Sequence, residues 1–174
     1  MKIGKNSAVQ YSAFALITVD EGDERLYLLQ WNDKWHLFNL IGGKLDNSKG
    51  DNNSLARTIY RELEEELGLR SQEEFLILNQ VLDIDMKQYS HRENRTKLYH
   101  FSVFEVDLFP RLPMSQDQRT YAARWLSTGR ENVFASKEEI IRLKTKDGRP
   151  ISPTTKALLL ALGELNPSQA LERP

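Results

Sequence analysis

Hydrophobic and polar positions along the first third of the chain predict β-strands. Residues 8–19 are apolar and rich in aromatic and β-branched side chains, and residues 26–29 resume that pattern after a polar turn. These two segments therefore predict a hairpin. After a second polar turn, another apolar run at 37–41 leads directly into Gly42 and Gly43.

The pattern then changes from strand to helix. Residues 46–54 are turn formers that predict a loop, and apolar side chains recur at helical spacing over 55–67. Ser54, or an Asn just before it, suits the N-cap position, and Gly68 suits the position after the last helical residue. The side chains expected to face the core are Ala56, Ile59, Leu63 and Leu67.

Two longer strands and one short strand are expected further along the chain. The longer ones cover about 75–86 and about 97–108, and the polar segment 88–95 between them predicts a hairpin loop. The short strand is expected at residues 124–126, which include Trp125.

The remaining segments predict helices and a loose end. One helix is expected over 136–144, and a C-terminal helix over about 153–165, begun by Ser152 and Pro153. Residues 166–174 are expected to form a loose tail. Because strands and helices are interspersed without a regular βαβ repeat, we expect an α/β (α+β) fold in which helices pack on a mixed sheet.

Composition narrows the class of protein. The chain has 174 residues, 40% hydrophobic and 28% charged, which is typical of one soluble globular domain spanning 1–174. A formal net charge of −1 argues against a broad nucleic-acid-binding surface. Cysteine is absent, which excludes disulfides, thiolate metal sites and a cysteine nucleophile. The longest apolar run, at 157–162, is too short to cross a membrane, so we expect a soluble, cytoplasmic protein.

The most informative segment is the acidic end of the helix predicted over 55–67. Helical spacing places Glu62, Glu65 and Glu66 on one flank of this helix, apart from Glu64. Like charges at these spacings weaken a helix, and the helix dipole disfavours acids near the C-terminus. A divalent cation such as Mg²⁺ would compensate for this arrangement. The alternative is a solvated acidic face with no ligand.

The glycine pair upstream of this helix adds to the picture. Adjacent glycines such as Gly42 and Gly43 let the backbone approach a ligand or metal closely, although in isolation a plain turn is the better explanation for them. A strand, a double glycine, a loop and an acidic helix in succession form a more specific arrangement than either feature alone.

These residues together resemble the Nudix box. The run from Arg61 to Leu69 (Arg-Glu-Leu-Glu-Glu-Glu-Leu-Gly-Leu) matches the second half of that motif at every fixed position. The segment 38–46 is similar to the strand and Gly-Gly-Lys that lead into the box, and Trp125 resembles a later aromatic landmark of the family. Over about residues 8–130, the order of the expected strands and helices also resembles that of the family.

The first half of the box departs from the family pattern. The family usually has Pro where Ile41 stands and Glu where Asp46 stands. Residues 44–60 separate Gly43 from Arg61, which makes the loop four residues longer than usual. The early glutamate of the box would fall at Lys49, and Asp51 is the best displaced substitute.

The resemblance implies a fold, a reaction and a set of roles. The implied fold is an α/β/α sandwich with a mixed sheet, and the implied reaction is Mg²⁺- or Mn²⁺-dependent hydrolysis of a nucleoside diphosphate linked to another group. Glu62, Glu65 and Glu66 would hold the metal, with the carbonyl of Gly42 as a backbone ligand. Arg61 would pair with a box carboxylate and fix its rotamer.

The sequence does not decide which residue is the general base. Glu65 or Glu66 could accept the proton of the attacking water, and some family members take the base from a later loop. Asp117 is the candidate by position in such a loop, and Glu93 is a weaker one. Lys44 is a weak candidate for a phosphate contact.

Other side chains are interpreted as structural. His36, His91 and His100 lack metal-ligand spacing. Three aromatic residues could stack on a nucleobase but are more often core residues near strand ends: Trp31, Trp35 and Tyr121.

Two alternatives to an active hydrolase follow from the same residues. The altered loop and the changes at Ile41 and Asp46 are compatible with a module of the same fold that binds a nucleotide, a sugar-phosphate or a protein partner without cleavage. An unrelated α/β protein with an acidic helix is the other. The sequence does not select a substrate, and a homodimer is a default expectation only.

Overall fold

The computed structural model describes residues 9–108, 129–166 and 168, and these residues form a mixed sheet of seven strands. The strands are β1 (Gln10–Leu16), β2 (Thr18–Glu21), β3 (Glu24–Asn32), β4 (Leu37–Lys44), β5 (Phe75–Ser90), β6 (Arg95–Leu108) and β7 (Asn132–Ser136). Their order is β2-β3-β4-β1-β6-β5, with β7 on β3. The pair β1–β6 is parallel and the other pairs are antiparallel, so the predicted mixed sheet is confirmed.

Strand β3 uses both of its edges for pairing. Tyr27 pairs with Thr18 of β2 on one side and with Ala135 of β7 on the other. Leu29, further along β3, pairs with Leu40 of β4. Strands β2 and β4 therefore share one edge of β3, and β7 occupies the opposite edge.

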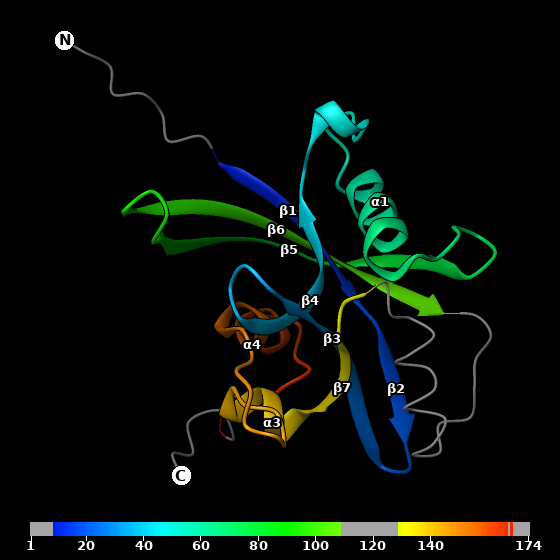
Figure 1. Ribbon diagram of the computed structural model, residues 1–174, viewed down its shortest axis with the longest axis vertical. Coiled ribbons are helices and arrows are strands. Elements are labelled where there is room, and N and C mark those ends of the chain that lie inside the picture. Colours follow the sequence, from blue (N-terminus) through cyan, green and yellow to red (C-terminus); the bar gives the residue numbers. More distant parts are fainter. Residues whose placement is uncertain (1–8, 109–128, 167, 169–174) are drawn as a thin grey trace.

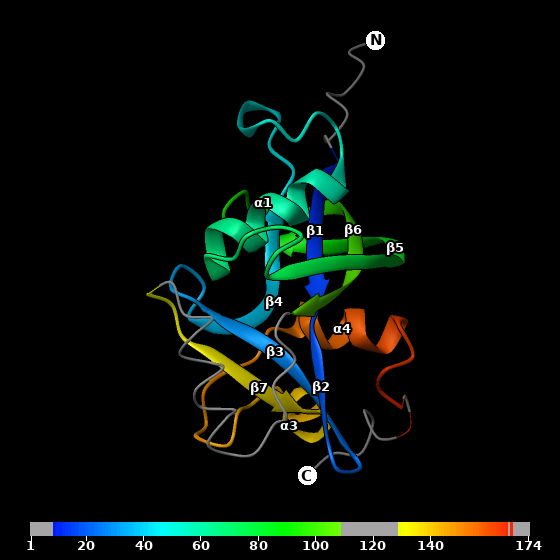
Figure 2. The same ribbon diagram turned by 90° about the vertical axis from the view of Figure 1, so that its right-hand side faces the viewer.

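Helices cover both faces of the sheet. Helix α1 (Leu55–Leu67) packs on one face, and α3 (Lys137–Arg142) and α4 (Pro153–Ala161) lie on the other, as Figure 1 and Figure 2 show. The buried side chains accordingly form two clusters, one beneath α1 and one beneath α3 and α4. The expected layered α+β architecture is confirmed. None of the helices in the described ranges is long and apolar enough to span a bilayer.

Helix α1 begins and ends where its sequence predicts. The Ser54 side chain accepts a hydrogen bond from the backbone N–H of Arg57, and Gly68 ends the helix with a left-handed φ of 64°. The apolar stripe is buried, but Ala56 is exposed, so the expectation that it faces the core is wrong. Thr58 is buried instead, because its hydroxyl donates to Asp51 of the preceding loop.

Several boundaries differ from those expected. The hairpin of β5 and β6 continues to Ser90 and restarts at Arg95, since cross-strand pairing carries polar residues into the sheet. Strand β7 was not predicted, because its few residues become a strand only by pairing with β3. Helix α4 ends at Ala161 rather than near 165. The expected strand at 124–126 and the expected tail beyond residue 168 lie outside the described residues.

A polar cluster joins β5 to β6 on one face of their hairpin. The ring of His100 lies between two carboxylates, with Nδ1 2.6 Å from Asp85 and Nε2 2.6 Å from Asp83. Both ring nitrogens donate only when the imidazole is protonated. Burial lowers the pKa of His100, but the hydrogen bonds to Asp85 and Asp83 outweigh it and raise the pKa above its usual value.

This cluster predicts a pH-dependent contribution to stability. Because the pKa of His100 is raised on folding, its contribution is fully present below about pH 6.5 and is lost as the pH rises through the folded-state value. We expect the stability difference between wild type and His100→Gln to shrink from pH 5.5 to pH 8.5, by at most about 1 kcal/mol for such an exposed pair. Urea denaturation at each pH measures it, and a difference that grows with pH contradicts the interpretation.

Candidate functional site

The glycine pair lies inside strand β4 and not in a turn. Gly42 pairs with Phe14 of β1 in the antiparallel ladder. A Cβ atom added to Gly42 would lie 2.0 Å from the carbonyl oxygen of Ala13, and one added to Gly43 would lie 2.3 Å from Glu62 Oε1. Both positions therefore require glycine for a close approach: one to the neighbouring strand, the other to a carboxylate of α1.

A buried ion pair joins the loop after β4 to helix α1. The carboxylate of Asp51 accepts from Arg61 Nε at 2.9 Å and from Arg61 Nη2 at 2.8 Å. It also accepts from the Thr58 hydroxyl at 2.9 Å and from the backbone N–H of Asp46 at 2.8 Å. Asp51 is only 1% exposed, and the hydrogen bonds from Arg61 hold its pKa well below the usual range.

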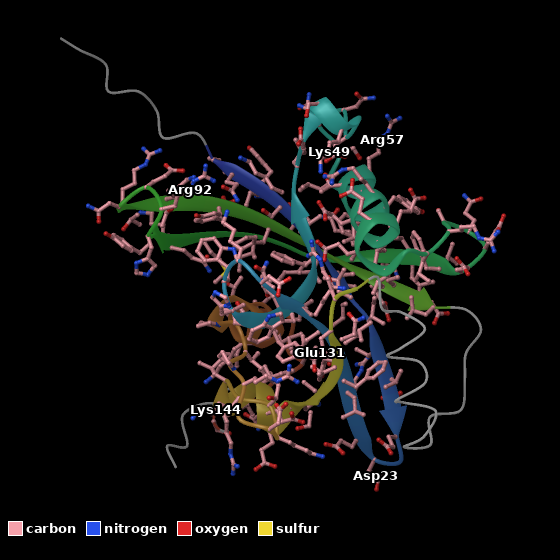
Figure 3. The ribbon with its side chains drawn as sticks, viewed as in Figure 1. Asp23, Lys49, Arg57, Arg92, Glu131 and Lys144 are labelled. Atoms are coloured by element: carbon pink, nitrogen blue, oxygen red, sulfur yellow. The ribbon has the colours of Figure 1, made fainter. Side chains whose placement is uncertain are left out.

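The longer loop has a compact local structure that brings Asp51 into this position. Asp46 caps the short 3₁₀ helix η1 (Asn47–Lys49), and Gly50 ends it with a left-handed φ of 90°. The loop thus folds back on itself and returns Asp51 to Asp46. It also places Lys49 with its Nζ 3.7 Å from Glu65 Oε2; Figure 3 shows Lys49 above the first turns of α1.

Arg61 links this loop to strand β4 and to the acidic flank, which consists of Glu62, Glu65 and Glu66 of α1. Its Nη2 donates to the carbonyl of Lys44 at 3.1 Å, just after the glycine pair. Its Nη1 donates to Glu62 at 2.8 Å and lies 3.4 Å from Glu65. The guanidinium therefore fixes the side chain of Glu62 and orients the helix relative to the end of β4.

The three glutamates of the acidic flank have different environments. Glu62 is buried against Gly43, and burial raises its pKa despite the opposing effect of Arg61. The side chain of Glu65 is 46% exposed between Arg61 and Lys49.

Glu66 is the most perturbed of the three. Burial is the largest cause that raises the pKa of Glu66 to about 7; Arg130 opposes the shift, and the charges of Glu62 and Glu65 add to it. Arg130 Nη1 lies 3.2 Å from Glu66 Oε1, and Gln30 Nε2 donates to the backbone carbonyl of Glu66 at 3.0 Å. Neither Arg130 nor Gln30 was predicted, because neither belongs to a local motif.

The acidic flank has the donor chemistry that a hard divalent cation needs. Carboxylate oxygens are the preferred ligands of Mg²⁺, and the repulsion of Glu66 by Glu62 and Glu65 is the kind of cost that a cation relieves. Because Gly43 has no side chain, the Glu62 carboxylate can lie directly against the backbone of β4. As the side chains stand, no group of three or more His, Asp or Glu residues within the described ranges is arranged to hold a metal.

Some predicted residues lie away from this flank. Glu93 is at the tip of the β5–β6 hairpin, next to Arg92 in Figure 3, where Lys97 and Arg95 lower its pKa to about 2. The structure therefore does not bring Glu93 to the acidic helix. The side chain of Lys44 is exposed at the end of β4, and its backbone carbonyl accepts a hydrogen bond from Arg61. Asp117, the other candidate base, lies outside the described residues.

The aromatic candidates for nucleobase stacking lie in different environments. Trp31 is partly buried and packs edge-on against Phe38, with ring centroids 5.1 Å apart, as expected of a core residue. Trp35 is 52% exposed in the turn after β3, so the expectation that it belongs to the core is wrong. Its ring lies in the turn between β3 and β4, with Lys34 Nζ 5.2 Å from the ring centroid. Tyr121 and Trp125 lie outside the described residues.

The match to a family model covers most of the chain. The model of the NUDIX domain matches residues 9–143. This chain therefore belongs to the NUDIX domain family, and the resemblance seen in the sequence is confirmed. No curated protein matches the chain.

Solved structures share the fold at low sequence identity. The match to the Escherichia coli ORF135 protein has a TM-score of 0.53 at 19% identity. It spans 92% of this chain and 94% of the ORF135 chain. The match to the Caenorhabditis elegans Ap4A hydrolase has a TM-score of 0.56 at 13% identity and spans 90% of this chain and 98% of the hydrolase chain. The match to the NUDIX domain of Shewanella oneidensis NrtR, solved with ADP ribose, has a TM-score of 0.55 at 13% identity. It spans 90% of this chain and 88% of the NrtR chain.

The Asp51–Arg61 pair predicts a large effect on stability. Asp51→Asn keeps the volume but removes the charge and turns an amide toward the hydrogen-bond donors of Arg61 and Thr58. We expect the free energy of unfolding to fall by about 3 kcal/mol, because a buried charge loses its partner. Urea denaturation measures this change.

Asp23→Asn is the matched control, since Asp23 is exposed in the turn between β2 and β3 (Figure 3). Its free energy of unfolding should stay within about 0.5 kcal/mol of wild type. Equal effects of the two substitutions would show that the buried pair is not a principal stabilising contact.

Proposed function

We propose that this chain is a divalent-metal-dependent pyrophosphohydrolase that cleaves a nucleoside diphosphate linked to another group. The observation that carries this proposal is the acidic flank beside the glycine pair: Glu62 lies against Gly43, and Glu65 and Glu66 follow on the same helix. Membership of the NUDIX domain family supports the reaction class.

The metal would be held by the acidic flank. Glu62, Glu65 and Glu66 are the side chains proposed as ligands of Mg²⁺ or Mn²⁺, with the carbonyl of Gly42 as a backbone ligand. Bound there, a divalent ion would neutralise the diphosphate and lower the pKa of a water molecule for attack on phosphorus. To take part, Glu65 and Glu66 would exchange their ion pairs with Lys49 and Arg130 for the metal.

The chain's own residues would supply position and proton transfer. Arg61 holds the carboxylate of Glu62 beside Gly43, which presets one ligand before substrate arrives. Glu65 or Glu66 would accept the proton of the attacking water, and Asp117 is the alternative base. Lys44, exposed at the end of β4, would contact a phosphate oxygen. Fixed charges around the diphosphate would provide most of the rate.

A second candidate function is binding without cleavage. It is favoured by the ion pairs that engage Glu65 and Glu66, and by the departures at Ile41 and Asp46. ADP ribose is a sensible first ligand, because a NUDIX domain of the same fold was solved with it. Calorimetry that detects binding of ADP ribose with Mg²⁺, but no product after long incubation, would favour this function.

The acidic side chains give the sharpest test of hydrolysis. Glu65→Gln and Glu66→Gln should each lower kcat by about two orders of magnitude or more, because each removes a proposed metal ligand and proton acceptor. Glu64→Gln is the matched control, since Glu64 is exposed on the other flank of α1 and should keep wild-type turnover.

The assay should cover ADP-ribose, dinucleoside polyphosphates, normal and oxidised nucleoside triphosphates and dinucleotide cofactors. Unchanged rates in both variants would eliminate the mechanism.

Metal removal gives an independent test. Dialysis against EDTA should abolish turnover of whichever substrate is found, and Mg²⁺ or Mn²⁺ should restore it. Running the reaction in ¹⁸O-water then shows which phosphorus is attacked, because the label enters one product only. Full activity in the presence of EDTA would contradict the proposed role of the acidic flank.

A further inference from the structure

Two buried amide side chains lie beneath the last turn of α1. Gln30 of β3 and Asn132 of β7 are directly opposite each other in the sheet register. Gln30 is 3% exposed and Asn132 is 7% exposed, and Gln30 Nε2 lies 3.0 Å from Asn132 Oδ1. This contact is formed within the sheet, between residues far apart in the sequence.

The same amide of Gln30 reaches the helix. Its Nε2 donates to the backbone carbonyl of Glu66 at 3.0 Å. The last four carbonyls of an α-helix have no intrahelical donor, and Glu66 is the penultimate residue of α1. Gln30 therefore supplies a donor that the helix itself cannot provide, at the residue whose side chain belongs to the acidic flank.

The segment just before β7 contributes a second contact to the same residue. Arg130, two positions before Asn132, has its Nη1 3.2 Å from Glu66 Oε1. Glu66 is thus held through its main chain by Gln30 and through its side chain by Arg130. The pairing of β3 with β7 brings the two segments that make these contacts side by side and joins Gln30 to Asn132.

The amide pair is not the arrangement that stability alone would favour. Gln30 Oε1 and Asn132 Nδ2 are buried and have no hydrogen-bond partner in the part of the chain that the structure describes. Turning the Gln30 amide over would place its oxygen against two acceptors, the Glu66 carbonyl and Asn132 Oδ1, so the observed orientation is the better one. Buried polar atoms without partners cost stability, and apolar side chains of the same shape would avoid that cost.

We propose that Gln30, held by Asn132, is a positioning residue that fixes the last turn of α1 and thereby sets the place of Glu66 in the metal site. The inference rests on the proposed function, in which Glu66 is a metal ligand. Groups that orient a metal ligand from behind have effects of about 10–100-fold on metal affinity or activity when they are removed.

The test is Gln30→Met, which keeps the length of the side chain and removes both polar atoms. We expect the dissociation constant for Mn²⁺, followed by the EPR signal of free Mn²⁺, to rise about 10–100-fold. At a fixed Mg²⁺ concentration kcat should fall by a similar factor, while KM changes by less than about threefold. The melting temperature should fall by only about 2–4 °C, because the variant removes the unpaired Oε1 of Gln30 but leaves the Glu66 carbonyl and Asn132 Oδ1 without their donor.

Two further variants test whether the effect comes from the lost hydrogen-bond donor of Gln30. One keeps the shape of the side chain, and the other makes the same substitution at a distant site. Gln30→Glu keeps the shape but replaces the donor Nε2 with an acceptor, so it should be at least as defective as Gln30→Met. Gln88→Met makes the same change at a glutamine of β5 whose amide donates to Thr154 of α4, on the other layer. It should leave Mn²⁺ affinity and kcat unchanged.

The outcomes distinguish this inference from the proposed function. If wild type hydrolyses no substrate of the panel, the proposed function fails, and the Mn²⁺ titration alone decides the inference. Equal Mn²⁺ affinity in wild type and Gln30→Met, or no binding by either, overturns it. A loss of activity that matches a large drop in melting temperature also overturns it, because Gln30 is then a structural residue.

Discussion

The buried ion pair between Asp51 and Arg61 is the contact on which the rest of the site depends. One guanidinium joins the loop after β4, the strand end at Lys44 and the acidic helix. A buried aspartate is tolerated only because four hydrogen bonds satisfy it. This pair anchors the longer loop to α1, and the same guanidinium holds Glu62 beside Gly43.

The acidic flank shows a tension between stability and chemistry. Three carboxylates near the C-terminus of a helix repel one another and the helix dipole. The fold moderates this repulsion with cations from separate segments: Arg61 from the helix, Lys49 from the loop and Arg130 from the segment before β7. This explains why Glu66 can be partly buried, and why the flank can exchange protein cations for a metal ion in the function we propose.

Strand β3 has a role that extends beyond the core. It pairs with β4, which carries the glycine pair, and with β7, which carries Asn132. Gln30 on this strand contacts the end of α1. The two ends of the acidic flank are therefore positioned by different parts of the sheet: Glu62 by the end of β4, and Glu66 by β3 and β7.

The sequence by itself determined the helix 55–67 with both of its ends, most of the strands and the family. These features depend on local spacing: a capping serine, a terminal glycine, an apolar stripe and the run from Arg61 to Leu69. Tertiary structure decided the exposure of Ala56 and Trp35, the strand β7, and the partners Gln30 and Arg130. These depend on contacts between segments distant in the chain, and no local pattern encodes which side chains a folded sheet will bring together.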